Sequence, residues 1–261
     1  MNMKKFLTIG ILPLMWIAYF IFELLTGRID SSDTIIGNLL LIGLFILVGF
    51  IIYKLTNKYE SGLKGKTLIS LFFIFLFIDQ FIKLIIHFFF FNDYYGFFND
   101  FLSFNPIIND KGSWLNARFG AGISFPVLIL LNIIALFVFL EVYRYYKSKG
   151  NSDIYSDLAI VFIFTGALCS LIDKVFYGGS LDFIGISDLF IADIKDIYIN
   201  LGIFFLILCL YNSGFFKDDE NSTFKDDINS TKHFLLFIKA DIKSGFKKKT
   251  ISISENKKSG Y

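Results

Sequence analysis

Six long apolar runs, separated by polar segments, make up most of the chain before Ser213. A helix needs about 20 apolar residues to cross a bilayer, and each run has about that length. The runs lack the apolar–polar alternation of a half-buried strand, and backbone in lipid must satisfy its own hydrogen bonds. The pattern predicts an all-α integral membrane protein with six spans: Phe6–Leu25, Ile35–Tyr53, Leu68–Phe91, Ile123–Tyr143, Leu158–Phe176 and Leu189–Tyr211.

The first run has one feature of a signal peptide, because Lys4 and Lys5 precede it. However, it is long enough to span, and no small-x-small cleavage site comes before the polar stretch Gly27–Asp30. We therefore expect a retained span.

Basic residues are concentrated in alternate connections between the spans. The rich segments are Lys4–Lys5, Lys54–Lys66, Arg144–Lys149 and the tail after Asn212, and the poor segments are Arg28–Asp33, Asn92–Gly122 and Tyr177–Asp188. The positive-inside rule then predicts that both termini are cytoplasmic and that the three poor segments are extracytoplasmic.

The tail, residues 213–261, is polar and rich in lysine. Its composition favours a solvated, partly disordered segment. The apolar patch His233–Ile242 offers an alternative, a short helix lying in the membrane interface.

The composition is typical of a membrane protein and argues against several kinds of partner and catalytic site. The chain is 55% hydrophobic with 35 Phe, and its net charge of +2 gives no basis for a nucleic-acid partner. Cys169 and Cys209 lie in apolar runs and are expected to be free packing residues. With only two histidines, His87 and His233, a histidine zinc site or a Ser-His-Asp triad is not expected.

Span three carries charged residues at helical spacing. Asp79, Lys83 and His87 are four residues apart and therefore share one helix face. Asp79 and Lys83 can neutralise each other at membrane depth, which favours a structural ion pair over a direct catalytic role.

The extracytoplasmic segment 92–122 mixes aromatic residues with glycine and asparagine, including Asn109 and Gly112. It is long for a simple connector. Composition does not choose between a plain loop and a small sheet or cradle on the membrane surface.

Five carboxylates cluster near the last two spans: Asp173, Asp182, Asp188, Asp193 and Asp196. The positive end of a helix explains Asp188 and Asp193 at the start of span six. It does not explain Asp182 and accounts poorly for Asp196. Two carboxylates that share one proton can activate water, so these residues could form a catalytic aspartate pair or have a structural or ion-pathway role.

Several segments resemble motifs of the lipoprotein signal peptidases (signal peptidase II), bacterial membrane aspartyl proteases with four spans. The similar segments are Asp79-Gln80-Phe81-Ile82-Lys83 (D-Q-x-x-K), Gly166–Lys174 (G-x-x-G-N-x-x-D-R), Ser180-Leu181-Asp182-Phe183 (V-V-D-F), and Asp196, Ile199 and Gly202 (D-x-x-I-x-x-G).

The resemblance implies a domain organisation. Residues 67–212 correspond to a four-span peptidase core with an outer loop at 92–122. Residues 1–66 are a two-span N-terminal extension, and residues 213–261 are the cytoplasmic tail.

The resemblance also implies a function at the outer face of the cell membrane. The substrates are lipidated prolipoproteins, cleaved just before a diacylglyceryl-modified cysteine, without a metal or organic cofactor. Asp182 and Asp196 correspond to the catalytic pair, with Asp173 and Lys174 bracing the site. The other residues assigned to support or substrate positioning are Asp79, Lys83, Asn109, Gly112, Ser170 and Asp193.

This chain departs from the family pattern around the proposed pair. Ser170 replaces Asn, Lys174 replaces Arg, and Asp193 and Lys195 stand at the Asn and Ala positions of N-x-A-D. Asn109-Asp110-Lys111-Gly112 replaces N-x-G. Asp193 is therefore a rival to Asp196 as the second catalytic residue.

Two other functions remain open on the sequence. The first is a non-catalytic relative that binds lipidated peptides. The second is a transporter or channel subunit that uses Asp79 and Lys83 as an intramembrane charge relay.

Overall fold

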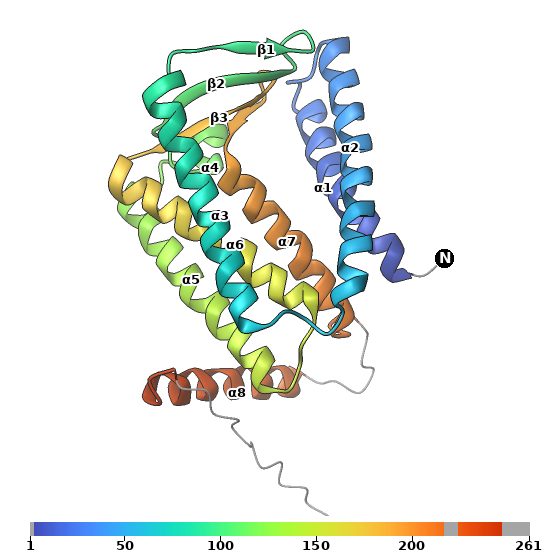
Figure 1. The fold of residues 1–261 in the computed structure, drawn as a ribbon, viewed down its shortest axis with the longest axis vertical. Coiled ribbons are helices and arrows are strands. Elements are labelled where there is room, and N and C mark those ends of the chain that lie inside the picture. The colour runs from blue at the N-terminus through green and yellow to red at the C-terminus, as the bar shows by residue number, and fades with distance from the viewer. Residues whose placement is uncertain (1–2, 217–223, 247–261) are drawn as a thin grey trace, which may run out of the picture.

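Six long helices stand side by side, with a small sheet at one end and a crossing helix at the other (Figure 1). The computed structural model describes residues 3–216 and 224–246. Six of its helices are long and apolar enough to cross a membrane, which confirms the predicted fold class. They are α1 (Met3–Leu25), α2 (Ser32–Thr56), α3 (Gly65–Ile85), α5 (Phe125–Ser148), α6 (Ile154–Ile172) and α7 (Ile194–Asn212).

The predicted start of the sixth span at Leu189 is wrong. Residues Phe190–Ala192 form strand β4, and α7 begins at Ile194, after the N-cap Asp193. Apolar content alone does not separate a short buried strand from the helix that follows it.

Helices α6 and α7 pack closely, and two glycines make this possible. A Cβ atom at Gly202 would lie 2.4 Å from the Ile163 side chain, and one at Gly166 would lie 2.7 Å from the Ile199 side chain. Neither position has room for a larger residue without movement of the helices. The close contact brings the sheet-side ends of α6 and α7 together.

The sheet comprises four antiparallel strands in the order β1-β2-β3-β4. These are Tyr95–Phe97, Leu102–Asn109, Ser180–Ile186 and Phe190–Ala192. The segment 92–122 contains β1, β2 and the short helix α4 (Trp114–Phe119). It therefore forms a small cradle and is not a plain loop. The β2–β3 register shifts between Phe104 and Ile107, next to Pro106, which has no backbone N–H to donate.

The first two helices pack against each other and contact the sheet. Ile29, Phe101, Ile186 and Leu189 form a buried apolar cluster where α1 and α2 meet the strands. Buried Glu23 of α1 lies 3.3 Å from Arg118 of α4.

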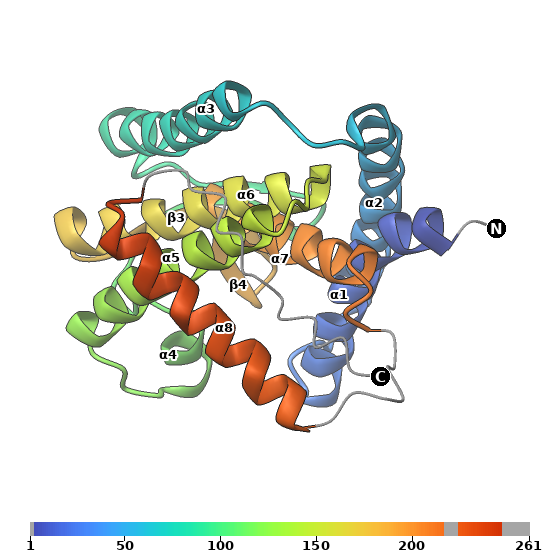
Figure 2. The same ribbon diagram turned by 90° about the horizontal axis from the view of Figure 1, so that it is seen from below.

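Helix α8 (Phe224–Lys243) crosses the end of the bundle opposite the sheet (Figures 1 and 2). The apolar patch His233–Ile242 is therefore helical and belongs to a longer helix than expected. Residues 217–223 and 247–261 of the predicted tail lie outside the described residues.

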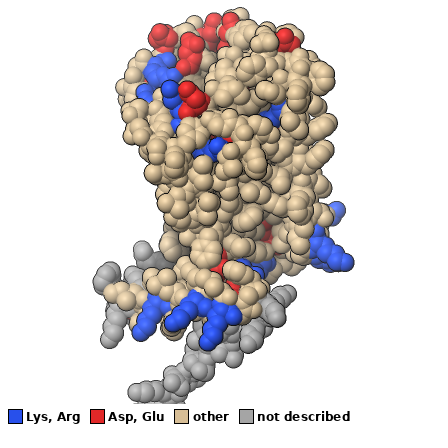
Figure 3. Space-filling view, turned by 90° about the vertical axis from the view of Figure 1, so that its left-hand side faces the viewer, with Lys and Arg blue, Asp and Glu red and all other residues tan. Residues whose placement is uncertain are grey.

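Charge is distributed unequally between the two ends. Asp and Glu gather at the sheet end, where some Lys and Arg also lie, and Lys and Arg predominate at the α8 end (Figure 3). This distribution accords with the orientation expected from the positive-inside rule.

Candidate active site

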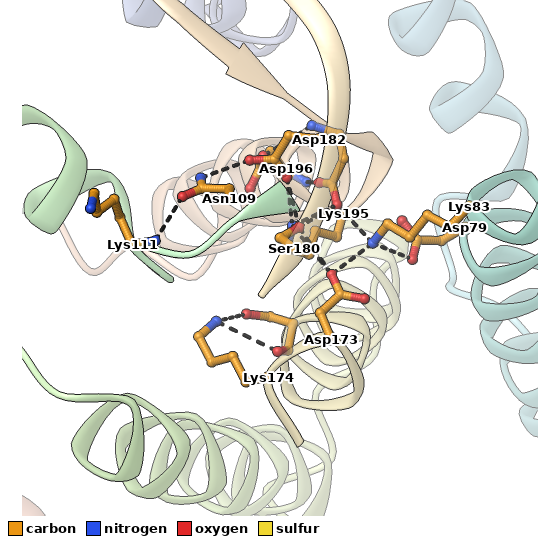
Figure 4. Close-up of polar contacts among 12 residues, drawn as sticks. Asp79, Lys83, Asn109, Lys111, Asp173, Lys174, Ser180, Asp182, Lys195 and Asp196 are labelled. Carbon is orange, nitrogen blue, oxygen red and sulfur yellow. Dashed lines mark hydrogen bonds and ion pairs between the residues drawn. The ribbon is translucent and has the colours of Figure 1, made fainter. Parts of the chain in front are cut away.

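Three carboxylates meet where β3 approaches the start of α7. One oxygen each from Asp182, Asp193 and Asp196 lie within 4.8 Å of one another. Asp182 comes from the middle of β3, and the other two come from the N-cap and first turn of α7 (Figure 4). The expected approach of Asp182 and Asp196 is therefore present, and Asp193 joins them.

Asp193 and Asp196 are held by a reciprocal capping box. The Asp193 side chain accepts a 3.2 Å hydrogen bond from the Asp196 N–H, and the Asp196 side chain accepts one of 3.2 Å from the Asp193 N–H. This satisfies two otherwise free donors at the start of α7. Asp188 does not have the expected helix-terminal role, because it lies in the exposed turn between β3 and β4.

Lys83 of α3 joins three carboxylates. Its ammonium lies 2.9 Å from Asp79, 2.8 Å from Asp173 and 2.7 Å from Asp193. The predicted Asp79–Lys83 pair is confirmed, and it is part of a larger buried network. All four side chains are buried.

His87 does not share this environment, contrary to the expectation from its spacing. Helix α3 widens into a π-helical turn at Ile86–Phe90, which changes the angle between successive side chains. His87 is exposed and packs edge-on against Phe88 and Phe91.

Lys195 is a central residue that the sequence analysis did not assign to the site. Its ammonium donates to Asp193 at 2.5 Å and lies 3.4 Å from Asp173 and 3.5 Å from Asp182. The side chain is buried, although it follows an N-cap on the first turn of a helix. The signal available in the sequence was the replacement of Ala by Lys beside Asp196.

Ser180 was also missed. Its hydroxyl donates to Asp182 at 2.6 Å, accepts from Lys195 and lies 3.2 Å from both Asp173 and Asp193. One hydroxyl therefore links the Lys195 ammonium to the Asp182 carboxylate.

Asn109 reaches the site from β2. Its Nδ2 donates to Asp182 at 2.7 Å, while its Oδ1 accepts from the Lys111 backbone N–H at 3.1 Å. The second bond orients the amide so that its NH₂ group faces the carboxylate. The β2–β3 register, which pairs Asn109 with Ser180, places it there.

Gly112 shapes the loop that follows. Its φ of +69° is in the left-handed region, and a Cβ there would lie 3.0 Å from Leu128.

Lys174 lies beside the carboxylates (Figure 4) and makes a separate contact with Ser170. The Lys174 ammonium donates to the Ser170 hydroxyl, which also accepts from Asn132 at 3.2 Å. Asp173 contacts the network directly, 2.8 Å from Lys83 and 3.4 Å from Lys195, whereas Lys174 forms no ion pair with a site carboxylate among the described residues.

The electrostatic environments of Asp182 and Asp193 differ. Burial by itself would raise the pKa of Asp193, but Lys195 and Lys83 lower it to about 2. Burial raises the pKa of Asp182, with Lys195 opposing the rise and Asp193 adding to it. Asp193 is therefore held ionised more firmly than Asp182, and it is the weaker base of the two.

The three neighbouring carboxylates also raise the question of a metal ion. Lys195 donates to Asp193 and lies 3.5 Å from Asp182, so an ammonium already compensates their charge and would repel a cation. The arrangement suits proton transfer better than metal binding.

The chain matches one protein family and is similar to two solved structures. Residues 71–212, more than half of the chain, match the family model described as signal peptidase (SPase) II. No curated protein matches the chain. Two solved structures of a bacterial membrane enzyme, determined by the in meso method, are similar. The structure at 2.3 Å resolution has 23% identity and a TM-score of 0.49, covering 63% of this chain and 99% of that one. The structure at 1.9 Å has 24% identity and a TM-score of 0.48, covering 61% and 98%. On the extent of the family match, this multi-pass membrane protein belongs to the signal peptidase II family of aspartic peptidases.

Proposed function

We propose that this protein is an active aspartic endopeptidase that removes signal peptides from diacylglyceryl-modified prolipoproteins. The observation that carries the proposal is the approach of Asp182 and Asp196, whose carboxylate oxygens lie within 4.8 Å of each other. At that separation one water molecule can hydrogen-bond to both carboxyl groups and link them.

We assign Asp182 as the ionised member of the pair. It accepts hydrogen bonds from Asn109 and Ser180 and lies 3.5 Å from the Lys195 ammonium. Donors around a carboxylate stabilise its charged form. Asp182 takes a proton from the water as the water oxygen bonds to the scissile carbonyl carbon.

We assign Asp196 as the protonated member. Among the described residues it accepts one backbone N–H and forms no ion pair, so little around it requires a negative charge. Its proton stabilises the oxygen of the tetrahedral intermediate. When the carbon–nitrogen bond breaks, the proton held by Asp182 passes to the leaving nitrogen.

Asp193 is better suited to position the site than to react. It is fully buried and lies 2.7 Å from Lys83 and 2.5 Å from Lys195. A carboxylate held between two ammonium groups is a weak base, which supports Asp196 over its rival.

The domain and orientation expectations are part of the proposal. Residues 67–212 supply every residue named in this mechanism, and residues 1–66 are an added pair of spans. The site faces the extracytoplasmic side of the cell membrane, with both termini in the cytoplasm, in agreement with the positive-inside rule.

The test is cleavage of a diacylglyceryl-modified prolipoprotein by purified protein, with mass spectrometry of the products. Asp182→Asn and Asp196→Asn should each abolish cleavage without changing the melting temperature, because Asn keeps the shape but cannot accept the proton. Asp188→Asn, in the exposed turn of the same segment, is the matched control and should cleave normally. If the unaltered protein binds the lipidated precursor but never cleaves it, the non-catalytic binder replaces this proposal.

A further inference from the structure

We propose that α8 is a membrane-surface helix that binds anionic phospholipid headgroups at the end of the bundle opposite the candidate active site. The proposal concerns a surface that the cleavage mechanism does not use. It rests on where α8 is held, on the depth of that position, and on the residues that α8 leaves exposed.

Specific contacts hold α8 against the last turns of α5. Arg144 makes two bonds to Asp241, of 2.5 and 2.8 Å, and a third of 2.9 Å to the Phe246 carbonyl. The Tyr145 ring lies 5.3 Å from that of Phe234 and 5.2 Å from that of Phe237. A bidentate arginine and three packed rings fix one face of α8 to the bundle.

The contact lies at the depth of a membrane–water boundary. Tyr145 is twenty residues after Phe125, the first residue of α5, which is roughly 30 Å at 1.5 Å per residue. The hydrocarbon core of a bilayer is about 30 Å thick. Helix α8 runs across the spans at this level, as a helix lying in the headgroup region would (Figures 1 and 2).

The outer face of α8 carries an apolar stripe. Ile228, Leu235 and Ile242 are seven residues apart, so they lie on one side of the helix, and they are 52%, 59% and 50% exposed. The docked residues Phe237 and Asp241 are on another side and are buried. The part of α5 just before the docking contact also exposes apolar side chains, including Val138 and Val142.

A row of lysines runs beside the stripe. Lys232 and Lys239 are also seven residues apart, Lys243 follows one turn later, and all three are exposed. Lys and Arg gather at this end of the molecule (Figure 3). Apolar side chains that insert beside ammonium groups that stay in water are the pattern of an interfacial helix, and the positive charge selects anionic lipid.

A single-tryptophan reporter tests the inserted face. In a Trp16→Phe/Trp114→Phe background, Leu235→Trp places the reporter on the stripe and Ala240→Trp places it on the opposite exposed side. The proteins are reconstituted in nanodiscs of brominated phosphatidylcholine, with or without brominated phosphatidylglycerol. We expect strong quenching of the Leu235→Trp reporter, further increased by phosphatidylglycerol, and weak quenching of the Ala240→Trp reporter. Equal quenching of both reporters overturns the proposal, and so does quenching that is the same with and without phosphatidylglycerol.

A second measurement leaves the apolar face and both native tryptophans intact. Native mass spectrometry counts the phosphatidylglycerol molecules retained by the unaltered protein and by the Lys232→Gln/Lys239→Gln/Lys243→Gln variant. We expect the variant to lose most of the retained lipid. The control Lys54→Gln/Lys58→Gln/Lys64→Gln makes the same charge change in the α2–α3 region and should lose much less. An equal loss in the two variants contradicts a site on α8.

Discussion

The Lys83 ammonium lies 2.7 Å from a carboxylate oxygen of Asp193, joining α3 to the N-cap of α7. The same ammonium contacts Asp79 and Asp173, so three segments of the chain converge on one buried cation. Because Asp193 and Asp196 cap each other, this ion pair also fixes the position of Asp196. The network that stabilises the bundle therefore positions the proposed catalytic pair.

Removing Lys83 should destabilise the protein. Lys83→Met leaves three buried carboxylates without their shared cation, and breaking a buried ion pair typically costs about 3–5 kcal/mol. Asp79→Ala should cost less, because Lys83 keeps Asp173 and Asp193. Thermal unfolding in detergent measures both. A Lys83→Met protein with an unchanged melting temperature, or an Asp79→Ala protein that folds normally but cleaves nothing, contradicts the structural role.

The two proposed catalytic residues should act as one unit. The Asp182→Asn/Asp196→Asn double variant should be hardly less active than either single variant, because losing one partner already disables the proton transfer. Residual cleavage rates of the three variants decide this. Rate losses that multiply would show two independent roles.

The Asp193–Lys195 ion pair should set the pH dependence of cleavage. Lys195 opposes the burial effect that raises the pKa of Asp182, so Lys195→Met should raise that pKa further. A base must be ionised to act, so kcat/KM would begin to fall at a higher pH as the solution is acidified. Asp193→Asn removes a nearby negative charge and should move the acidic limb the opposite way. Shifts in the same direction would contradict this assignment.

Asn109 should assist cleavage through its side chain, and Lys111 only through its backbone. Asn109→Ala removes the 2.7 Å bond to Asp182 and should lower kcat/KM roughly tenfold, about 1.4 kcal/mol. Lys111→Ala keeps the N–H that orients Asn109 and should have little effect. Kinetic comparison of the two variants is the measurement, and equal losses would point to a general disturbance of the loop.

Buried Glu141 of α5 should be replaceable with a gain in stability. Neither of its side-chain oxygens has a hydrogen-bond partner within the described part of the chain. An unpartnered buried polar group is costly, so Glu141→Met should raise the melting temperature. A lower melting temperature would show that Glu141 contributes an interaction that its surroundings do not reveal.

Features that depend on local pattern could be read from the sequence. Bilayer thickness dictates the length and apolar character of a span, so the six helices were predictable. Helical geometry brings residues four apart together, and the Asp79–Lys83 pair follows from it. Asp193 was recognisable as a helix-terminal residue for the same local reason, and motif resemblance singled out Asp182 and Asp196.

Other features required the tertiary structure, because they join residues far apart in the chain. The β2–β3 register brings Asn109 to Asp182, and close α6–α7 packing brings the ends of two spans together. No local pattern marks Ser180 as a site residue, and the sequence signal for Lys195 is limited to its replacement of Ala beside Asp196. Their importance comes from the carboxylates that folding places around them, and it depends on distances that a linear pattern does not contain.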